Sequence, residues 1–180
     1  EHRVGLTPSS VRECVAHGHE VIVEASAGAG IGAADAAYEK AGARIVAGAA
    51  EVFEHAELVV KVKEPQPDER RRLREGQVLF TYLHLAPDAA QAEDLVASRA
   101  VCIAYETVTQ AGGGLPLLAP MSEVAGRMAV QAGAHCLEKH AGGMGTLLGG
   151  VPGVPPAKIV VLGAGVVGTN AAQIAVGSGA

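Results

Sequence analysis

Short runs of Val, Ile and Leu alternate along the first 105 residues with stretches whose apolar positions recur at helical spacing. The apolar runs predict strands at residues 19–24, 43–46, 57–63, 77–83 and 100–105. The intervening stretches predict helices at residues 8–17, 34–41, 49–55, 67–74 and 88–98. Near-continuous apolar strands separated by short helices are typical of βαβ units. The pattern therefore predicts an α/β fold with a doubly wound, Rossmann-like parallel sheet.

The pattern changes after Tyr105. A loop rich in Gly and Pro precedes a long helical stretch at 121–140, for which Ser122 is a plausible N-cap. A second connector rich in Gly and Pro covers residues 141–157. We therefore expect three parts along the chain. They are a substrate or catalytic domain at 1–124, a bridging helix and connector at 125–157, and the start of a second domain at 158–180.

The second domain opens with a glycine fingerprint. An apolar run at 159–162, expected as a strand, leads into Gly-Ala-Gly-Val-Val-Gly and an alanine-rich helical stretch. In this setting the glycines permit a tight turn and close approach of a pyrophosphate to a helix N-terminus. The alternative is a glycine-rich turn without a ligand. The residues expected to bind a dinucleotide are Gly163, Gly165, Val166, Val167 and Gly168.

Ionisable residues stand at the ends of three expected strands. Lys63 ends one, His84 follows the next, and Glu106 follows a third. Ligands of open α/β sheets bind outside the carboxyl ends of the strands. A lysine there can neutralise a carboxylate or carbonyl oxygen, and a histidine can transfer a proton near neutral pH. From spacing alone, a functional site and ordinary solvated strand ends remain equally open.

Composition narrows the class of protein. Hydrophobic residues make up 49% of the 180 positions and the net charge is −5, which suits a sizeable core and gives no basic surface for nucleic acid. The cluster Arg70, Arg71, Arg72 and Arg74 is expected to be the solvated face of a short helix. Three widely spaced cysteines indicate a reduced, cytoplasmic protein. No apolar run suits a membrane span, and no group of histidines has metal-ligand spacing, so neither membrane nor metal is expected.

Several motifs, in order along the chain, resemble bacterial L-alanine dehydrogenases. They are RVGLTP (3–8), VKVKEP (60–65), HLA (84–86), LPLLAPMSEVAGRMAVQAGAH (115–135) and VPGVPPAKIVVLGAGVVGTNAA (151–172). The resemblance implies NAD-dependent oxidative deamination of L-alanine to pyruvate and ammonia. It also implies a homo-hexamer. The acidic residue expected to separate NAD from NADP would lie beyond Ala180.

The resemblance assigns roles to particular residues. Arg3 matches an arginine that grips the substrate carboxylate, Lys63 a lysine that binds pyruvate oxygens, and His84 the general acid/base. Glu106 and Met121 match residues near the substrate. Ser122 matches a cofactor contact, and Lys61 is expected to be structural or solvated.

The chain also departs from the family pattern. The resemblance places a first strand before residue 1 and a catalytic aspartate beyond Ala180, so these 180 residues alone are expected to be inactive. Met144 stands where an arginine is common. One alternative is the NAD-binding subunit of proton-translocating transhydrogenase, which usually lacks the histidine of the HLA motif. Others are a non-catalytic dinucleotide-binding module and, more distantly, a reductase of the saccharopine type.

Overall fold

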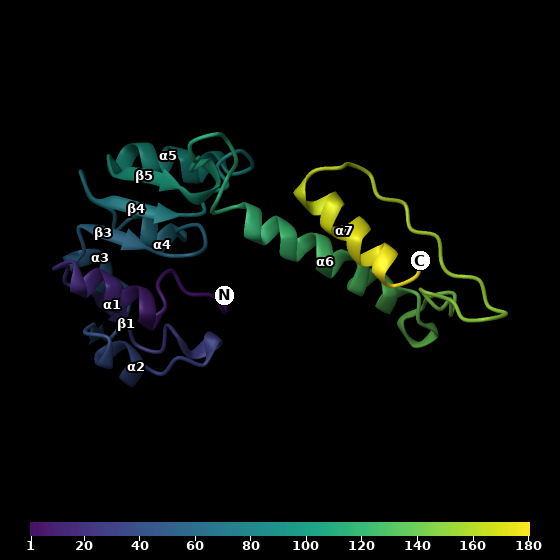
Figure 1. Cartoon of the computed structure of the whole chain (residues 1–180). Helices are drawn as coiled ribbons and strands as arrows, with labels where there is room; N and C mark the ends of the chain where they lie inside the picture. Colours follow the sequence, from purple (N-terminus) through teal and green to yellow (C-terminus); the bar gives the residue numbers. More distant parts are fainter. The chain divides into compact units, whose positions relative to one another are not determined.

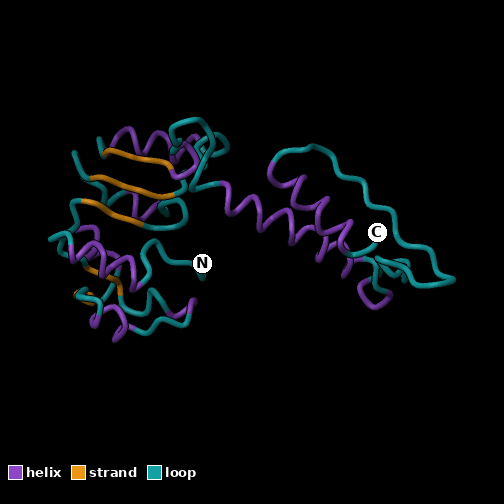
Figure 2. The backbone as a smooth tube through the Cα atoms, in the orientation of Figure 1, coloured by secondary structure: helices purple, strands orange, loops and turns teal.

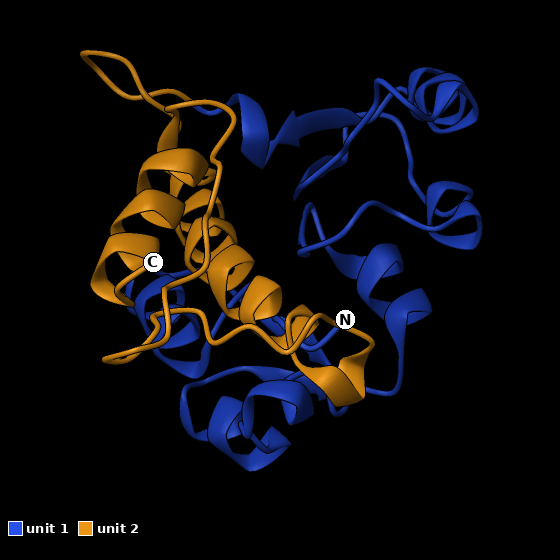
Figure 3. Cartoon of the chain, turned by 90° about the vertical axis from the view of Figure 1, so that its right-hand side faces the viewer, with its two compact units in different colours: residues 1–108 blue, residues 109–180 orange.

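The computed structural model describes residues 1–180 and divides the chain into two compact units. The first unit comprises Glu1–Val108 and the second Thr109–Ala180 (Figure 3).

The first unit alternates helices and strands, as its hydrophobic pattern predicts (Figure 1). Its α-helices are α1 (Pro8–Ala16), α2 (Asp35–Lys40), α3 (Ala49–His55), α4 (Pro67–Arg70) and α5 (Ala89–Ser98). Its strands are β1 (Ile22–Glu24), β2 (Arg44–Val46), β3 (Leu58–Val60), β4 (Val78–Thr81) and β5 (Val101–Ala104). Two 3-10 turns complete the unit, η1 (Ala29–Ile31) and η2 (Tyr105–Thr107).

All strand pairs are parallel, which confirms the predicted α/β class, but the strands form two ladders. One ladder joins β1 to β2, and the other has the order β3-β4-β5 (Figure 2). In the larger ladder Val59 lies opposite Leu79, and Leu79 lies opposite Cys102. This register brings the carboxyl ends of β3, β4 and β5 to the same edge.

Local sequence signals explain where two helices begin. Thr7 caps α1, because its side chain accepts a hydrogen bond from the Ser10 backbone at 3.3 Å and Pro8 occupies the first turn. Asp88 caps α5 in the same way, accepting from the Gln91 backbone at 2.9 Å. Both caps satisfy N–H groups that have no partner within the helix.

The expectation of a solvated arginine cluster was wrong at Arg70, whose side chain is only 9% exposed and pairs with Asp94 at 2.7 Å. Helix α4 ends at Arg70, so the other three arginines are exposed as expected but lie beyond the helix. Arg74 donates hydrogen bonds to the backbone oxygens of Phe53 and Ala56. Backbone carbonyls and the Asp94 carboxylate thus bind side chains that the local sequence marks only as charged.

Two apolar clusters form the core of the first unit. One surrounds the β3-β4-β5 ladder and contains Phe53, Val59, Leu73, Leu79, Leu83 and Leu95. The other lies beside the β1-β2 ladder and contains Val11, Tyr38, Ala41 and Ala43. Tyr38 is buried, and its hydroxyl donates to the Leu6 backbone oxygen at 3.0 Å. The strands that carry Lys63, His84 and Glu106 at their ends are therefore anchored by the first cluster.

The second unit contains α6 (Ala119–Cys136), the 3-10 turn η3 (Lys139–Ala141) and α7 (Val166–Gly177). Helices α6 and α7 pack closely around Val130, Ala171 and Ala175. A Cβ added at Gly126 of α6 would lie 2.3 Å from the Val167 oxygen of α7, so only glycine fits at this crossing.

Three expectations for this unit need correction. Helix α6 begins at Ala119, so Ser122 lies in its first turn and its backbone N–H bonds to the Leu118 oxygen at 3.2 Å. Pro120 suits that first turn because its missing N–H has no partner there. The helix ends at Cys136 rather than 140, since Glu138 is extended. Residues 159–162 form no strand, because no neighbouring strand in the chain pairs with them.

None of the helices is long and apolar enough to cross a membrane.

Candidate functional site

The three ionisable residues at the predicted strand ends lie at one edge of the larger ladder. Lys63 follows the end of β3 by three residues and His84 follows the end of β4 by three. Glu106 lies two residues beyond β5, in the turn η2. Because the three strands are parallel neighbours, the structure brings these segments together as the strand order requires.

Backbone hydrogen bonds extend the pairing of β3 and β4 toward Lys63. The Tyr82 backbone N–H donates to the Val62 oxygen at 3.2 Å, and the buried Thr81 hydroxyl donates to the Lys63 oxygen at 2.8 Å. These bonds fix the Lys63 backbone while its side chain stays 49% exposed. The Lys63 side chain is therefore half-exposed while its backbone is held by hydrogen bonds.

His84 has a backbone conformation that non-glycine residues rarely adopt. Its φ is +46°, in the left-handed region. The Glu106 carboxylate accepts hydrogen bonds from the backbone N–H of His84 at 2.8 Å and of Leu83 at 3.1 Å. The buried Gln91 amide donates to the Leu83 oxygen from α5. The surrounding structure therefore holds a strained turn, as is common at functional sites.

The electrostatics of Glu106 follow from these bonds. Burial by itself raises the pKa of this carboxyl group, because it disfavours the charged form. Hydrogen bonds from the backbone N–H groups of His84, Glu106 and Leu83, with the nearby His84 charge, outweigh burial and lower the pKa of Glu106. Glu106 is therefore a carboxylate near neutral pH, and its oxygens act as acceptors for the turn.

Glu64 connects the two candidate catalytic residues, although the sequence analysis did not select it. One carboxylate oxygen lies 3.8 Å from Lys63 Nζ and the other lies 3.8 Å from His84 Nε2. The carboxylate can therefore orient both side chains by charge. The available signal was its position directly after Lys63, since an acidic residue at a strand end has the same claim to the site as a lysine.

Tyr82 is a second residue that the sequence analysis missed. Its ring makes an edge-to-face contact with Tyr105 at 4.9 Å between centroids and lies 6.3 Å from the His84 ring. Tyr105 in turn meets Phe80 at 4.3 Å, and burial followed by the influence of Tyr82 raises the pKa of Tyr105 to about 12. The rings of Phe80, Tyr82 and Tyr105 therefore pack together beside the His84 turn.

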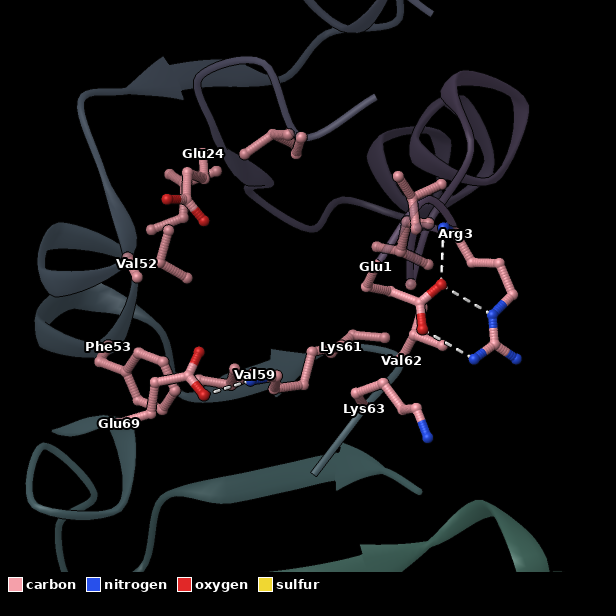
Figure 4. A pocket seen from close by; sticks show the side chains of 18 of the residues that line it. Glu1, Arg3, Glu24, Val52, Phe53, Val59, Lys61, Val62, Lys63 and Glu69 are labelled. Carbon is pink, nitrogen blue, oxygen red and sulfur yellow. Dashed lines mark hydrogen bonds and ion pairs between the residues drawn. The ribbon is translucent and has the colours of Figure 1, made fainter. Parts of the chain in front are cut away.

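Arg3 presents its guanidinium to a carboxylate. Arg3 Nε donates to one Glu1 oxygen at 2.9 Å and a terminal nitrogen donates to the other at 2.8 Å (Figure 4). This two-pronged pairing raises the pKa of Arg3, to which Tyr82 and Glu64 also contribute through their charge. Arg3 therefore shares its electrostatic surroundings with the Lys63–Glu64–His84 group, and its fork has the geometry that recognises carboxylates.

A cavity of about 660 Å³ adjoins these residues and lies between the two ladders. Apolar side chains of β1 and β3 line it, including Ile22, Val23 and Val59. Arg3, Lys63 and Glu64 also line it, and Figure 4 shows the first two among its side chains. The site thus combines an apolar cavity with a few convergent charges, the usual composition of a small-molecule site.

The two lysines of the VKVKEP motif have different surroundings. Lys61 forms an ion pair with Glu69, and both side chains are 21% exposed. The same Glu69 carboxylate accepts from the Gln66 backbone at 2.6 Å, within the capping box of α4. Lys61 is therefore held in a structural ion pair, whereas the side chain of Lys63 is 49% exposed.

Met121 and Ser122, the remaining predicted contacts, lie in the first turn of α6 in the second unit. Met121 is 37% exposed and Ser122 is half-buried.

The glycine motif has the backbone that a dinucleotide site needs. Gly163 has φ +100°, and a Cβ at Gly168 would lie 2.0 Å from the Gly163 oxygen, so both positions require glycine. Gly165, the N-cap of α7, has open space where a Cβ would be. No side chain caps α7, whose helix begins with Val166 and Val167. Its first N–H groups are thus available to an anion.

Family models match both parts of the chain. The model described as "Alanine dehydrogenase/PNT, N-terminal domain" matches residues 1–125, and "Alanine dehydrogenase/PNT, C-terminal domain" matches residues 129–180. The alanine dehydrogenase of Halomonas elongata is 62% identical over the whole chain, which covers 48% of that protein. That of Bacillus subtilis is 56% identical, with 47% covered. The chain thus spans about half the length of these curated relatives.

Solved structures show the same similarity. A structure of L-alanine dehydrogenase matches the whole chain with a TM-score of 0.92 and 54% identity, and the match covers 50% of that chain. The transhydrogenase from Sinorhizobium meliloti matches the whole chain with a TM-score of 0.78 and 31% identity, covering 53% of that chain.

Proposed function

The chain belongs to the alanine dehydrogenase/PNT family, and on this premise we propose that the whole protein is an NAD-dependent L-alanine dehydrogenase. The reaction converts L-alanine, water and NAD⁺ into pyruvate, ammonium, NADH and a proton. The observation that carries the proposal is the grouping of Lys63, Glu64 and His84 at one sheet edge, next to a cavity that Arg3 also lines.

Arg3 and Lys63 supply the positive charge that the substrate requires. The Arg3 fork already holds the Glu1 carboxylate through two hydrogen bonds, so it suits the carboxylate of alanine or pyruvate once Glu1 turns away. Lys63 lies on the same cavity and places an ammonium beside the carbonyl oxygen of pyruvate. Negative charge that develops on this oxygen is then stabilised by a group already in place.

His84 transfers the protons. In the deamination direction, water attacks the iminium carbon of the oxidised substrate, and His84 Nε2 accepts a proton from this water. His84 then gives the proton to the nitrogen that leaves as ammonia. Glu64 lies 3.8 Å from Nε2 and can orient the ring, while Glu106 fixes the backbone from which the ring projects.

The cofactor fits the glycine motif. Gly163 and Gly165 would let a pyrophosphate approach the uncapped N-terminus of α7, where the backbone N–H groups of Val166 and Val167 would hold it, and Gly168 allows the close packing of this turn. When bound, NAD⁺ accepts the hydride from the alanine Cα. Ser122 is proposed as a further contact to the cofactor and Met121 as a contact to the substrate, both by family resemblance.

The remaining proposals rest on the family alone. We propose a cytoplasmic homo-hexamer whose substrate domain ends near residue 124, with 125–157 as the bridge and an NAD-binding domain from 158. Multi-angle light scattering of the full-length protein measures the number of subunits directly.

Formation of NADH from L-alanine and NAD⁺ by the full-length protein tests the main proposal. The His84→Ala variant is measured beside it, together with NAD⁺ binding by both proteins. We expect alanine-dependent NADH formation that falls at least about a thousandfold in the variant, with NAD⁺ binding retained. NAD⁺ binding without turnover by the wild type would instead favour a transhydrogenase subunit or a non-catalytic module.

A further inference from the structure

Two histidines and a glutamate converge where α6 ends, and none of the three has a role in the site described above. His135 lies in the last turn of α6, while Glu138 and His140 lie in the tight exit that contains η3. One ligand atom from each residue can be chosen so that all three lie within 4.8 Å of one another. All three residues are exposed, so an ion in solution reaches them freely.

The distances suit a metal ion. The same Glu138 oxygen lies 3.6 Å from His135 Nδ1 and 3.2 Å from His140 Nε2. Two ligands bound tetrahedrally at the usual zinc distances are about 3.4 Å apart. Small rotations of exposed side chains therefore bring the set into coordination geometry without a change in the backbone.

The backbone beneath the three residues is constrained. The backbone oxygen of Glu138 accepts hydrogen bonds from the backbone N–H groups of Ala141 at 3.1 Å and Gly143 at 2.9 Å. The backbone oxygen of Leu137 accepts one from the N–H of Gly145 at 2.7 Å. A Cβ at Gly143 would lie 2.2 Å from the Cys136 oxygen, so this turn requires glycine there. Ligands held on such a turn lose little conformational freedom when an ion binds.

The charge around the cluster also favours a cation. The C-terminus of α6 carries partial negative charge from its last carbonyls, and His135 lies within that turn. Glu138 adds a full negative charge between the two imidazoles. Lys139 opposes the effect, although its aliphatic stem lies alongside Gly145.

We propose that His135, Glu138 and His140 form a binding site for a divalent transition-metal ion, with Zn²⁺ as the ion used to test it. Imidazole nitrogens favour zinc and its first-row neighbours over magnesium and calcium, which prefer oxygen ligands. Three protein ligands leave one tetrahedral position open to water or to a group from another molecule. The site binds exchangeable zinc at the surface and is separate from the proposed hydride-transfer chemistry.

Calorimetric titration of tag-free full-length protein with ZnCl₂ tests the proposal, with Co²⁺ absorption as a report of coordination geometry. We expect His140→Ala and Glu138→Gln each to weaken one Zn²⁺ site more than about tenfold, and the double variant His135→Ala/His140→Ala to lose it. Titration with MgCl₂ should give the same result for the wild type and for these variants, because Mg²⁺ should not bind at this site.

Matched variants exclude other sources of binding. His55→Ala removes an exposed histidine from the last turn of α3, and Cys136→Ser removes the neighbouring thiol. Neither is expected to change Zn²⁺ affinity more than about twofold. Equal Zn²⁺ binding by the wild type and the His135→Ala/His140→Ala variant would overturn the proposal, and so would a wild type that binds no Zn²⁺. Circular dichroism confirms that the variants are folded.

Discussion

The Glu106 carboxylate holds the backbone N–H of His84 at 2.8 Å and keeps that residue at a φ of +46°. A side chain at the end of β5 thus determines the conformation of a residue at the end of β4. Because Glu106 also accepts from Leu83, it replaces the ladder partners that the chain loses where the strand stops.

Glu106→Gln tests this relationship in the full-length enzyme. Glutamine keeps the size but has a single acceptor oxygen, and its amide N–H₂ faces backbone donors. We expect kcat to fall about tenfold or more while NAD⁺ affinity stays within about twofold. Steady-state kinetics and NAD⁺ titration measure both quantities. Glu54→Gln, at an exposed position on α3, is the control. An unchanged kcat in Glu106→Gln would show that the His84 turn does not depend on this carboxylate.

The lowered pKa of Glu106 predicts a dependence of stability on pH. The ordinary value is 4.5 and the folded-state value lies below it, so the folded chain binds fewer protons between the two values. Stability therefore rises with pH in this interval. The contribution is complete above about pH 4.5 and is lost as the pH falls through the folded pKa. Urea unfolding from pH 7 to acid should show a smaller difference between wild type and Glu106→Gln at low pH. A stability difference between wild type and Glu106→Gln that does not change with pH would contradict the lowered pKa of Glu106.

Lys63→Ala and Lys61→Ala separate substrate binding from stability within one motif. Lys63 projects from a fixed backbone beside Glu64, so its loss should raise the KM for pyruvate at least about tenfold with little effect on unfolding. Lys61 pairs with Glu69, so its loss should lower the free energy of unfolding by about 1 kcal/mol and leave KM nearly unchanged. Kinetics and urea unfolding are measured for both variants. A raised KM in Lys61→Ala together with a lowered free energy of unfolding in Lys63→Ala would show that Lys61 binds the substrate and Lys63 stabilises the fold.

Gly165→Ala and Gly168→Ala separate cofactor binding from packing. The Cβ at position 165 meets open space and the backbone there suits any residue, so the variant should fold normally yet bind NAD⁺ at least about tenfold more weakly. The Cβ at position 168 would lie 2.0 Å from the Gly163 oxygen, so this variant should lower the melting temperature as well. Calorimetry and thermal unfolding test both. Normal NAD⁺ binding by a folded Gly165→Ala variant would place the pyrophosphate elsewhere.

The hydrophobic pattern determined the elements and their parallel pairing. Apolar runs placed all five strands of the first unit, with observed lengths of three or four residues inside longer predictions. Thr7 and Pro8 marked the start of α1 because a helix cap acts within one turn. The strand ends that carry Lys63, His84 and Glu106 followed from the same pattern, since parallel strands present their carboxyl ends at one edge.

Tertiary structure decided what those residues meet. The contact of Glu64 with both Lys63 and His84 joins segments 20 residues apart, and the bond from Glu106 to His84 spans 22 positions. Neither pairing is visible in a local pattern, because hydrophobic periodicity specifies which face is buried and leaves polar pairing unspecified. Likewise, the His135, Glu138 and His140 cluster forms only because α6 ends at Cys136 and the chain turns back. The sequence thus determined the sheet edge, and the folded chain determined the charge network on it.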